Sequence, residues 1–382
     1  KNKNDNKIMK FTLSSTALSN KLFALAKVIN SKNSLPVLAD FVFKTEGNVL
    51  FITTSDGENT MSTTLELSEC DANDSFAIEN HNLLEAVKGF SEQPLTFDVD
   101  NNSKNVKIIY QNGQFSLPID EADNFPKPQT VSDMAPSISL SSALLAENIT
   151  RSVFATAQDE LRPVMNGIYF CISSEGLVVV ATDGHKLVRN RIFDIKSEQE
   201  SSFILPKKPA LLLKNMLAKD DSIVSMKFDN ANAEVVFGDT RLVCRLIEGR
   251  YPNYKSVIPQ NNPNTMTIDR DTLLGALKRV QPFANDTSKL VRFRIDSHVL
   301  QLDAEDFDFS KTATERMSCE YDGTPMSIGF KGNSFIEVLN NIEESEVALK
   351  LSDPSRAGIV VPSVQQENQD LLMLLMPMLL ND

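Results

Sequence analysis

Asp183 and His185 are the two side chains in this sequence whose types and spacing most resemble acid–base chemistry. A carboxylate close to an imidazole can hold and move a proton. No serine or cysteine nucleophile motif and no partner at metal-ligand spacing accompanies them. The same turn occurs earlier in the chain as Asp56-Gly57, where Glu58 takes the place of His185. The pattern therefore favours a shared tight turn, in which glycine accepts a positive φ, over a catalytic pair.

The bulk composition is that of an ordinary globular protein with an acidic balance. The chain has 382 residues, 41% of them apolar, and a formal net charge of −13. This charge argues against a protein that coats nucleic acid over its whole surface, but it leaves room for a local basic face. The four cysteines are scattered without a Cys-x-x-Cys spacing, which indicates reduced, individually buried thiols and neither a disulfide framework nor a zinc site.

The two ends of the chain carry no recognisable targeting signal. Residues 1–8 are polar and precede a Met9-Lys10-Phe11 that looks like a natural start, so we expect a disordered leader there. The apolar tail 371–380 is half the length of a membrane span. We expect a cytoplasmic protein that has no contact with a membrane.

The elements that must position the two Asp-Gly turns are repeated along the chain. From Asp56 to Asp183 is about 127 residues, a spacing that suits a whole repeated domain. One strand–helix–strand–strand–strand unit recurs six times, in three pairs, and a strand is also expected over residues 37–45. The helices are expected at residues 16–29, 82–90, 141–154, 209–217, 272–280 and 334–342.

This recurrence predicts an α+β protein of three tandem like domains. Because no helix lies between consecutive strands of a unit, the sheets should be antiparallel, with the helices on one face. Pro-rich stretches at 120–136 and 249–263 act as linkers. The expected domains are 9–134, 135–260 and 261–382, and six like modules suggest a ring closed by a head-to-tail homodimer.

Six short motifs occur in a fixed order along the chain and together resemble the bacterial DNA polymerase III beta subunit family, the sliding clamps. They are Met9-Lys10-Phe11-Thr12, Leu35-Pro36-Val37-Leu38, Asn166-Gly167, Ala181-Thr182-Asp183-Gly184-His185, Arg250-Tyr251-Pro252-Asn253-Tyr254 and Met376-Pro377-Met378. The resemblance implies the DNA clamp fold and a non-catalytic processivity subunit that needs no cofactor or metal. It also implies that another protein opens the ring, since the chain has no Gly-x-x-x-x-Gly-Lys-Ser/Thr phosphate loop.

The resemblance implies that helices line a central hole around double-stranded DNA, held through phosphate contacts without sequence preference. Lysines on amphipathic helices usually form only the solvated side of the helix. Their concentration on the helices of an acidic chain, together with the resemblance, favours a DNA-binding face for Lys32, Lys207 and Lys208. The candidates are Lys27, Lys32, His81, Lys207, Lys208, Lys214, Lys278 and Arg279. Glu337, Glu343 and Glu344 in the final helical unit do not fit a uniformly basic lining.

The resemblance also implies one pocket per chain, between domains 2 and 3, that takes apolar side chains of short partner peptides. Its apolar, Met-containing wall suits several partners. The alternative is that the apolar C-terminal tail, residues 371–380, is only the last strand of a core. Ser256 and Leu379 stand where the family often has arginine. The implied residues are Arg162, Met165, Thr182, Gly184, His185, Lys186, Leu187, Pro252, Ser256, Val257, Leu374, Leu375, Met376, Pro377, Met378 and Leu379.

The partners that follow from the resemblance belong to replication and repair. They are the DNA polymerase III catalytic subunit, the clamp loader, other DNA polymerases, ligase and mismatch-repair proteins. Phe115 and Phe283 are placed at the dimer edge. Two other classes remain as alternatives: a hydrolase that uses Asp183 and His185, and a structural repeat protein without DNA.

Overall fold

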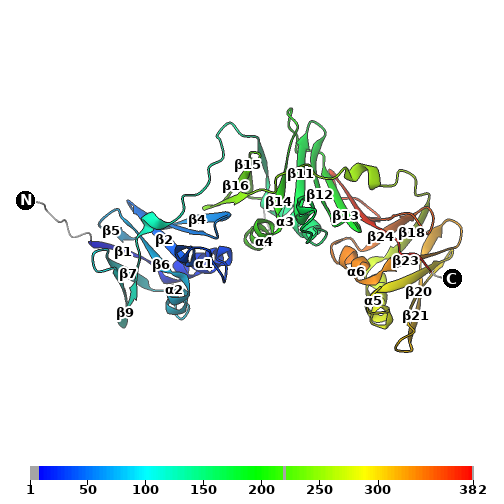
Figure 1. The fold of residues 1–382 in the computed structure, drawn as a ribbon, viewed down its shortest axis with the longest axis horizontal. Coiled ribbons are helices and arrows are strands. Elements are labelled where there is room, and N and C mark those ends of the chain that lie inside the picture. Colours follow the sequence, from blue (N-terminus) through cyan, green and yellow to red (C-terminus); the bar gives the residue numbers. More distant parts are fainter. Residues whose placement is uncertain (1–7, 218–220, 381–382) are drawn as a thin grey trace, which may run out of the picture. The chain divides into compact units, whose positions relative to one another are not determined.

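The computed structural model describes residues 8–217 and 221–380, and over them one β-α-β-β-β unit occurs six times. Figure 1 shows the succession of these units along the chain, coloured from blue to red. In the first domain they are β1 (Ile8–Ser14), α1 (Ser15–Leu25), β2 (Asp40–Glu46), β3 (Val49–Ser55) and β4 (Asn59–Glu66), then β6 (Ser75–Glu79), α2 (Asn80–Val87), β7 (Pro94–Asp100), β8 (Asn105–Tyr110) and β9 (Gly113–Pro118).

The second and third domains repeat this order. The second has β10 (Ser137–Ser141), α3 (Ser142–Val153), β11 (Gly167–Ser173), β12 (Gly176–Thr182) and β13 (Lys186–Ile192), then β14 (Ser201–Pro206), α4 (Lys207–Met216), β15 (Ile223–Phe228), β16 (Asn232–Phe237) and β17 (Thr240–Arg245). The third has β18 (Asn264–Asp269), α5 (Arg270–Val280), β19 (Leu290–Ile295), β20 (Val299–Asp306) and β21 (Lys311–Ser318), then β23 (Met326–Lys331), α6 (Gly332–Asn340), β24 (Glu346–Leu351), β25 (Gly358–Pro362) and β26 (Gln369–Leu375).

Each domain is held together because its two units exchange their first strands. In the first domain β1 pairs with β7 of the second unit, while β6 pairs with β2 of the first. The same exchange places β10 beside β15, β14 beside β11, β18 beside β24 and β23 beside β19. Neither unit of a pair can complete its sheet alone, which is why the units come in pairs.

Two of the four sheets continue across a domain boundary. Strand β4, the last strand of the first β-α-β-β-β unit, pairs with β17 of the second domain, and β13 of the second domain pairs with β26 of the third. The resulting orders are β10-β15-β16-β17-β4-β3-β2-β6 and β14-β11-β12-β13-β26-β25-β24-β18-β22, with β22 (Glu320–Asp322) as a short added edge strand. The other two sheets are β5-β1-β7-β8-β9, in which β5 (Glu69–Cys70) is short, and β21-β20-β19-β23.

By compactness the chain divides into two parts and not three. These parts are called unit 1 and unit 2, and each contains several of the β-α-β-β-β repeats. Unit 1 takes the chain to Ala143 together with Asn215–Leu246, and unit 2 takes Leu144–Lys214 and the chain from Ile247. The division runs through the second domain because one half of that domain shares a sheet with the first domain and the other half with the third. The three-domain division therefore follows the sequence repeat, and the two-unit division follows the sheets.

Helices α1 and α5 begin at side-chain caps and bury one apolar stripe. Ser14 Oγ accepts a hydrogen bond from the backbone N–H of Ala17, and Asp269 Oδ1 accepts one from Thr272. On α5 the buried residues are Leu273, Ala276, Leu277 and Val280, the spacing of a one-sided helix. Helix α1 packs on α2 in unit 1, and α5 packs on α6 in unit 2.

Several expected bounds are wrong, each for a local reason. Residues 37–39 are a 3₁₀ turn, Pro36–Ala39, because proline fixes φ and supplies no N–H for a ladder; β2 starts at Asp40. The first helix ends at Leu25 and tightens into a 3₁₀ turn, Ala26–Val28. The predicted leader was residues 1–8. Residues 1–7 lie outside the described residues, but Ile8 is not part of a leader, because it begins β1 and pairs with Asp100.

Candidate functional site

The Asp183-Gly184 turn is a hydrogen-bonded hairpin connection. Asp183 Oδ1 accepts hydrogen bonds from the backbone N–H groups of His185 (2.8 Å) and Lys186 (2.9 Å), and Gly184 has φ +90°. At the earlier turn, Asp56 Oδ1 accepts from the N–H groups of the second and third residues after it, and Gly57 has φ +96°. The carboxylate therefore closes the turn in both copies, which leaves it poorly placed to act as a base.

A cavity of about 270 Å³ opens beside this turn. All of its wall comes from unit 2. Most of the lining side chains are apolar, which suits the insertion of an apolar side chain from a ligand. The lining residues are Arg162, Met165, Thr182, Gly184, His185, Lys186, Leu187, Pro252, Asn253, Tyr254, Val257, Leu374 and Met376.

Strands β13 and β26 form the wall where the second domain meets the third. Leu187 lies directly opposite Leu374 in the antiparallel ladder, and both side chains are buried. Just past the end of β26, the backbone N–H of Met376 donates a hydrogen bond to His185 O at 2.9 Å. The Met376 side chain is 42% exposed, so it offers free apolar surface at the edge of the cavity.

The remaining wall comes from two short 3₁₀ turns. Pro163–Asn166 carries Met165, and Tyr254–Val257 follows Pro252. The second segment is fixed by tyrosines: the rings of Tyr251 and Tyr169 stack with centroids 4.7 Å apart. Burial raises the pKa of both phenols further above physiological pH, so neither ring brings a charge to this wall.

Five of the predicted pocket residues do not line this cavity. Leu375 points to the opposite face of β26 from Leu374, because successive side chains of a strand alternate, and it packs in the core of the third domain. Ser256 Oγ donates to Asn253 O at 2.7 Å. Leu379 lines a separate cavity of about 560 Å³ beside β19–β21. The other two are Pro377 and Met378, and Met378 instead forms a bridge with Gly329.

Two lining residues were missed by the sequence reasoning. Asn253 and Tyr254 belong to the Arg250–Tyr254 motif that carries the resemblance, but only Pro252 of that motif was assigned to the pocket. The motif itself was the available signal in the sequence. In the structure, the stacking of Tyr251 on Tyr169 holds this linker segment against the sheet.

The candidate DNA-binding residues lie on or beside helices in both units. In unit 1, Lys27, Lys32 and His81 are exposed. In unit 2, Lys207 and Lys208 begin α4, Lys214 lies in its last turn, and Lys278 and Arg279 lie in the last turn of α5. Arg279 is bound to Glu315 of β21, and this hydrogen bond raises the pKa of the guanidinium.

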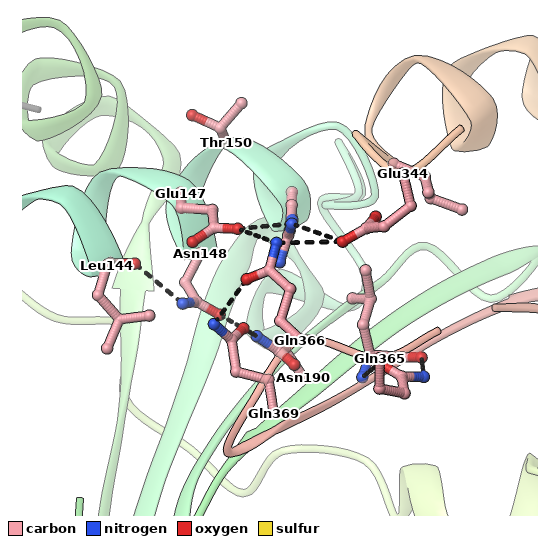
Figure 2. A network of polar contacts seen from close by, with 12 residues as sticks. Leu144, Glu147, Asn148, Thr150, Asn190, Glu344, Gln365, Gln366 and Gln369 are labelled. Atoms are coloured by element: carbon pink, nitrogen blue, oxygen red, sulfur yellow. Dashed lines mark hydrogen bonds and ion pairs between the residues drawn. The ribbon is translucent and has the colours of Figure 1, made fainter. Parts of the chain in front are cut away.

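Two of the three acidic residues that did not fit a basic lining, Glu337 and Glu344, have partners in the second domain, whereas Glu343 is exposed. Glu337 Oε2 lies 2.5 Å from the Lys186 ammonium, and Glu344 faces the buried guanidinium of Arg151. Figure 2 shows Gln366 reaching both Glu344 and Glu147 of α3, with Nε2–Oε1 distances of 3.1 and 3.3 Å. These carboxylates join the second domain to the third.

The predicted dimer residues lie near two edge strands. Phe115 lies in the edge strand β9, and its ring stacks near Phe90 and Tyr110 with centroids 6.2 and 5.9 Å apart. Phe283 lies in the 3₁₀ turn Gln281–Phe283, which contacts the edge strand β21, and is 40% exposed.

Among the residues that the structure describes, no group of three or more His, Cys, Asp and Glu side chains is arranged to hold a metal ion. Over those same residues, none of the helices has the length and apolar character to cross a bilayer.

The fold defines the class to which this chain belongs, that of the DNA polymerase sliding clamps. A sliding clamp from Pseudomonas aeruginosa, solved with a ligand, superposes with a TM-score of 0.91 at 25% identity, over 97% of this chain and all of that one. A clamp from Bacillus subtilis shares the fold with a TM-score of 0.91 at 19% identity, over 98% of this chain and all of that one.

The sequence comparisons give the family. Models of the N-terminal, central and C-terminal domains of the DNA polymerase III beta subunit match residues 9–129, 139–253 and 255–379. The beta sliding clamp of Pseudomonas putida is 26% identical over 97% of this chain and its own full length; that of Caulobacter vibrioides is 25% identical over 93% and 96%. The chain belongs to the DNA polymerase III beta subunit family, and it is a non-catalytic sliding clamp of three tandem clamp domains.

Proposed function

We propose that two copies of this chain close head-to-tail into a ring around double-stranded DNA and so tether the replicative polymerase. The observation that carries this proposal is the pairing of last strands. Two of the six β-α-β-β-β repeats join by pairing their last strands, β4 and β17. Two more join in the same way through their last strands β13 and β26. The last strands that remain at sheet edges are β9 and β21. Unpaired edges are liabilities that proteins cover, and continuing the pattern pairs β9 of one copy with β21 of the next.

The DNA face follows from the charges on the helices. The eight candidates would contact phosphates directly or through water, by lysine ammonium groups, one guanidinium and one imidazole. They are Lys27, Lys32, His81, Lys207, Lys208, Lys214, Lys278 and Arg279. Such contacts carry no sequence information and allow sliding. Lys186 and Arg151 hold Glu337 and Glu344 in the domain boundary, which lessens the negative charge that these acids would bring to the lining.

The cavity beside the Asp183-Gly184 turn is the site where partners dock. Its apolar lining, with Met165 and Met376, suits inserted aliphatic or aromatic side chains of a short peptide. The partners are the polymerase catalytic subunit, the clamp loader, other DNA polymerases, ligase and mismatch-repair proteins, all in the cytoplasm. A hydrolase is disfavoured, because the Asp183 carboxylate closes its own turn.

Sedimentation equilibrium tests the ring. The wild-type chain should have twice the mass of one chain at micromolar concentration, and Phe283→Asp should shift it toward one, since it places a charge beside β21. Phe193→Asp is the matched control, because Phe193 is 42% exposed and follows β13, and so belongs neither to the edge strands nor to the turn of Phe283. A wild-type monomer, or equal masses for both variants, contradicts the proposed closure.

A further inference from the structure

A second and larger cavity opens on the sheet that carries the peptide cavity. Its volume is about 930 Å³, and every residue of its lining belongs to unit 2. Strands β24, β25 and β26 contribute apolar side chains that are each 6–9% exposed, namely Ala348, Ile359, Val361 and Leu372. We call this cavity the sheet groove.

The sheet groove continues the peptide cavity across the strands. Leu374 of β26 lines the peptide cavity, and Ile359 of β25, its direct partner in the ladder, lines the groove. Directly opposed residues lie on one face of a sheet, so the same row runs on through Lys350 to Thr265 of β18. A peptide seated at Leu374 can therefore extend over the strands into the groove.

One linker segment forms a wall of both cavities. Val257 lines the peptide cavity, and Pro259 and Asn262 line the groove. Asn262 Nδ2 donates hydrogen bonds to the backbone oxygens of Lys350 at 2.9 Å and Ala357 at 3.0 Å. These bonds attach the segment beside the end of β24 and the start of β25, so the wall of the groove is fixed to the sheet.

The charged side chains of the groove favour a cationic occupant. The lining has three carboxylates and two cations, and one pair is already formed, because Arg189 Nη2 lies 2.6 Å from Asp370 Oδ2. Among the residues that the structure describes, Glu320 and Glu346 have no ion-pair partner, and both are exposed. Two carboxylates therefore face one remaining cation, Lys350, and the groove is left with a net negative charge.

Arg189 also has an unused hydrogen-bond donor at this groove. The residue is only 6% exposed, and its buried Nε has no partner among the described residues. Buried donors without an acceptor are rare in folded proteins, so this N–H indicates a missing acceptor. A backbone carbonyl group of a peptide in the groove would supply one.

Resting on the proposed peptide site, we propose that the sheet groove binds the extended flank of the same partner peptide, with a lysine or arginine of that flank between Glu320 and Glu346. These carboxylates lie on β22 and β24, on either side of β18, which is three strands away from β26. Strand spacing places this point about 14 to 18 Å from Leu374. An extended chain covers that distance in about five residues.

Fluorescence polarisation of two fluorescein-labelled peptides tests the groove. Each carries Leu-Phe among serine and glycine residues, and they differ by Lys or Gln about five residues from this pair; both are made with the extension on either side. Wild-type protein should bind the Lys form about fivefold more tightly when the extension is on one of the two sides. A lysine directly beside Leu-Phe should change the affinity less than about twofold, because it lies too far from the two carboxylates.

Two double variants identify the carboxylates that read this charge. Glu320→Gln/Glu346→Gln should bring the Lys and Gln forms within about twofold of each other and leave the affinity for the Gln form unchanged. Glu175→Gln/Glu198→Gln removes the same charge from exposed residues outside the groove lining, and it should keep the preference for Lys.

Two results would overturn the groove proposal while leaving the peptide site standing. One is equal affinity of wild-type protein for the Lys and Gln forms with the extension on either side. The other is a preference for Lys that the two double variants change equally. Failure of all the peptides to bind wild-type protein would overturn both proposals.

Discussion

Leu187 and Leu374 are directly opposed in one antiparallel ladder, although the first belongs to the second domain and the second lies near the C-terminus. Both side chains are buried and both line the candidate peptide cavity. The cavity therefore exists only where the two domains share a sheet. Its ligand affinity should depend on apolar surface at this boundary.

Met376→Ala should weaken, by about fivefold, the binding of a fluorescein-labelled synthetic octapeptide that carries two adjacent apolar residues, Leu-Phe, among serines and glycines. The substitution removes a half-exposed thioether that a ligand would cover, and it leaves the β13–β26 ladder intact. Fluorescence polarisation gives the affinity, and thermal unfolding checks that the fold is unchanged.

Val364→Ala is the control for this substitution. Val364 is 78% exposed and lies outside the cavity lining, so its truncation should leave the affinity unchanged. Equal affinities for wild type and Met376→Ala would remove Met376 from the site.

Arg151→Met should destabilise the protein by about 3 kcal/mol, because it leaves Glu147 and Glu344 facing each other without their shared cation. The Arg151 side chain is 3% exposed, so solvent screens this network little. Urea unfolding measures the loss. The double variant Arg151→Met/Glu344→Gln should recover part of it, since one of the two charges is gone.

An exposed ion pair provides the comparison. Arg356 contacts Asp353 with its side chain 68% exposed, and Arg356→Met should cost less than about 0.5 kcal/mol. Similar losses for Arg151→Met and Arg356→Met would mean that the buried network adds nothing to the domain boundary.

Asp40→Asn should stabilise the protein at pH 8 but not at pH 4. Burial, with the nearby Asp120 and Glu79 carboxylates, raises the pKa of Asp40 from 3.8 to about 6. The folded state therefore binds this proton more tightly than the unfolded chain. The stability it supplies is full below pH 3.8 and is lost as the pH rises through 6. At pH 8 the asparagine should gain about 1 kcal/mol after screening.

Thermal unfolding at the two pH values measures this difference. Asp123→Asn alters an exposed carboxylate and should change the unfolding temperature little at either pH. A gain for Asp40→Asn that is equal at pH 4 and pH 8 would exclude titration of Asp40 as its cause.

The repeat was predictable from the sequence because hydrophobic periodicity recurs in phase six times. The exchange of first strands was not, because nothing in the short apolar patterns of β1 and β6 shows whether each strand pairs within its own unit or with the other one. Strand β21 has no clear signal in the sequence, because most of its residues are polar, as in a loop. Only its pairing with β20 makes it a strand; the polar residues include Lys311, Thr312, Thr314, Glu315 and Arg316.

The pocket could be predicted in outline only through the resemblance, and its limits needed the fold. A run such as Leu374-Leu375-Met376 gives no sign of which side chain faces which core until β26 is paired. The roles of Glu337 and Glu344 were hidden for the same reason: their partners Lys186 and Arg151 lie in another domain, far away in the sequence. Long-range charge pairing has no local signal.

Retention on DNA tests the central account most directly. The protein is loaded by its clamp loader onto nicked circular DNA, isolated on the circle, and the circle is then cut once with a restriction enzyme. A closed ring that touches only phosphates should stay on the intact circle and slide off the free ends of the linear product. Equal retention before and after the cut would mean that the protein grips DNA directly, and it would contradict a sliding ring.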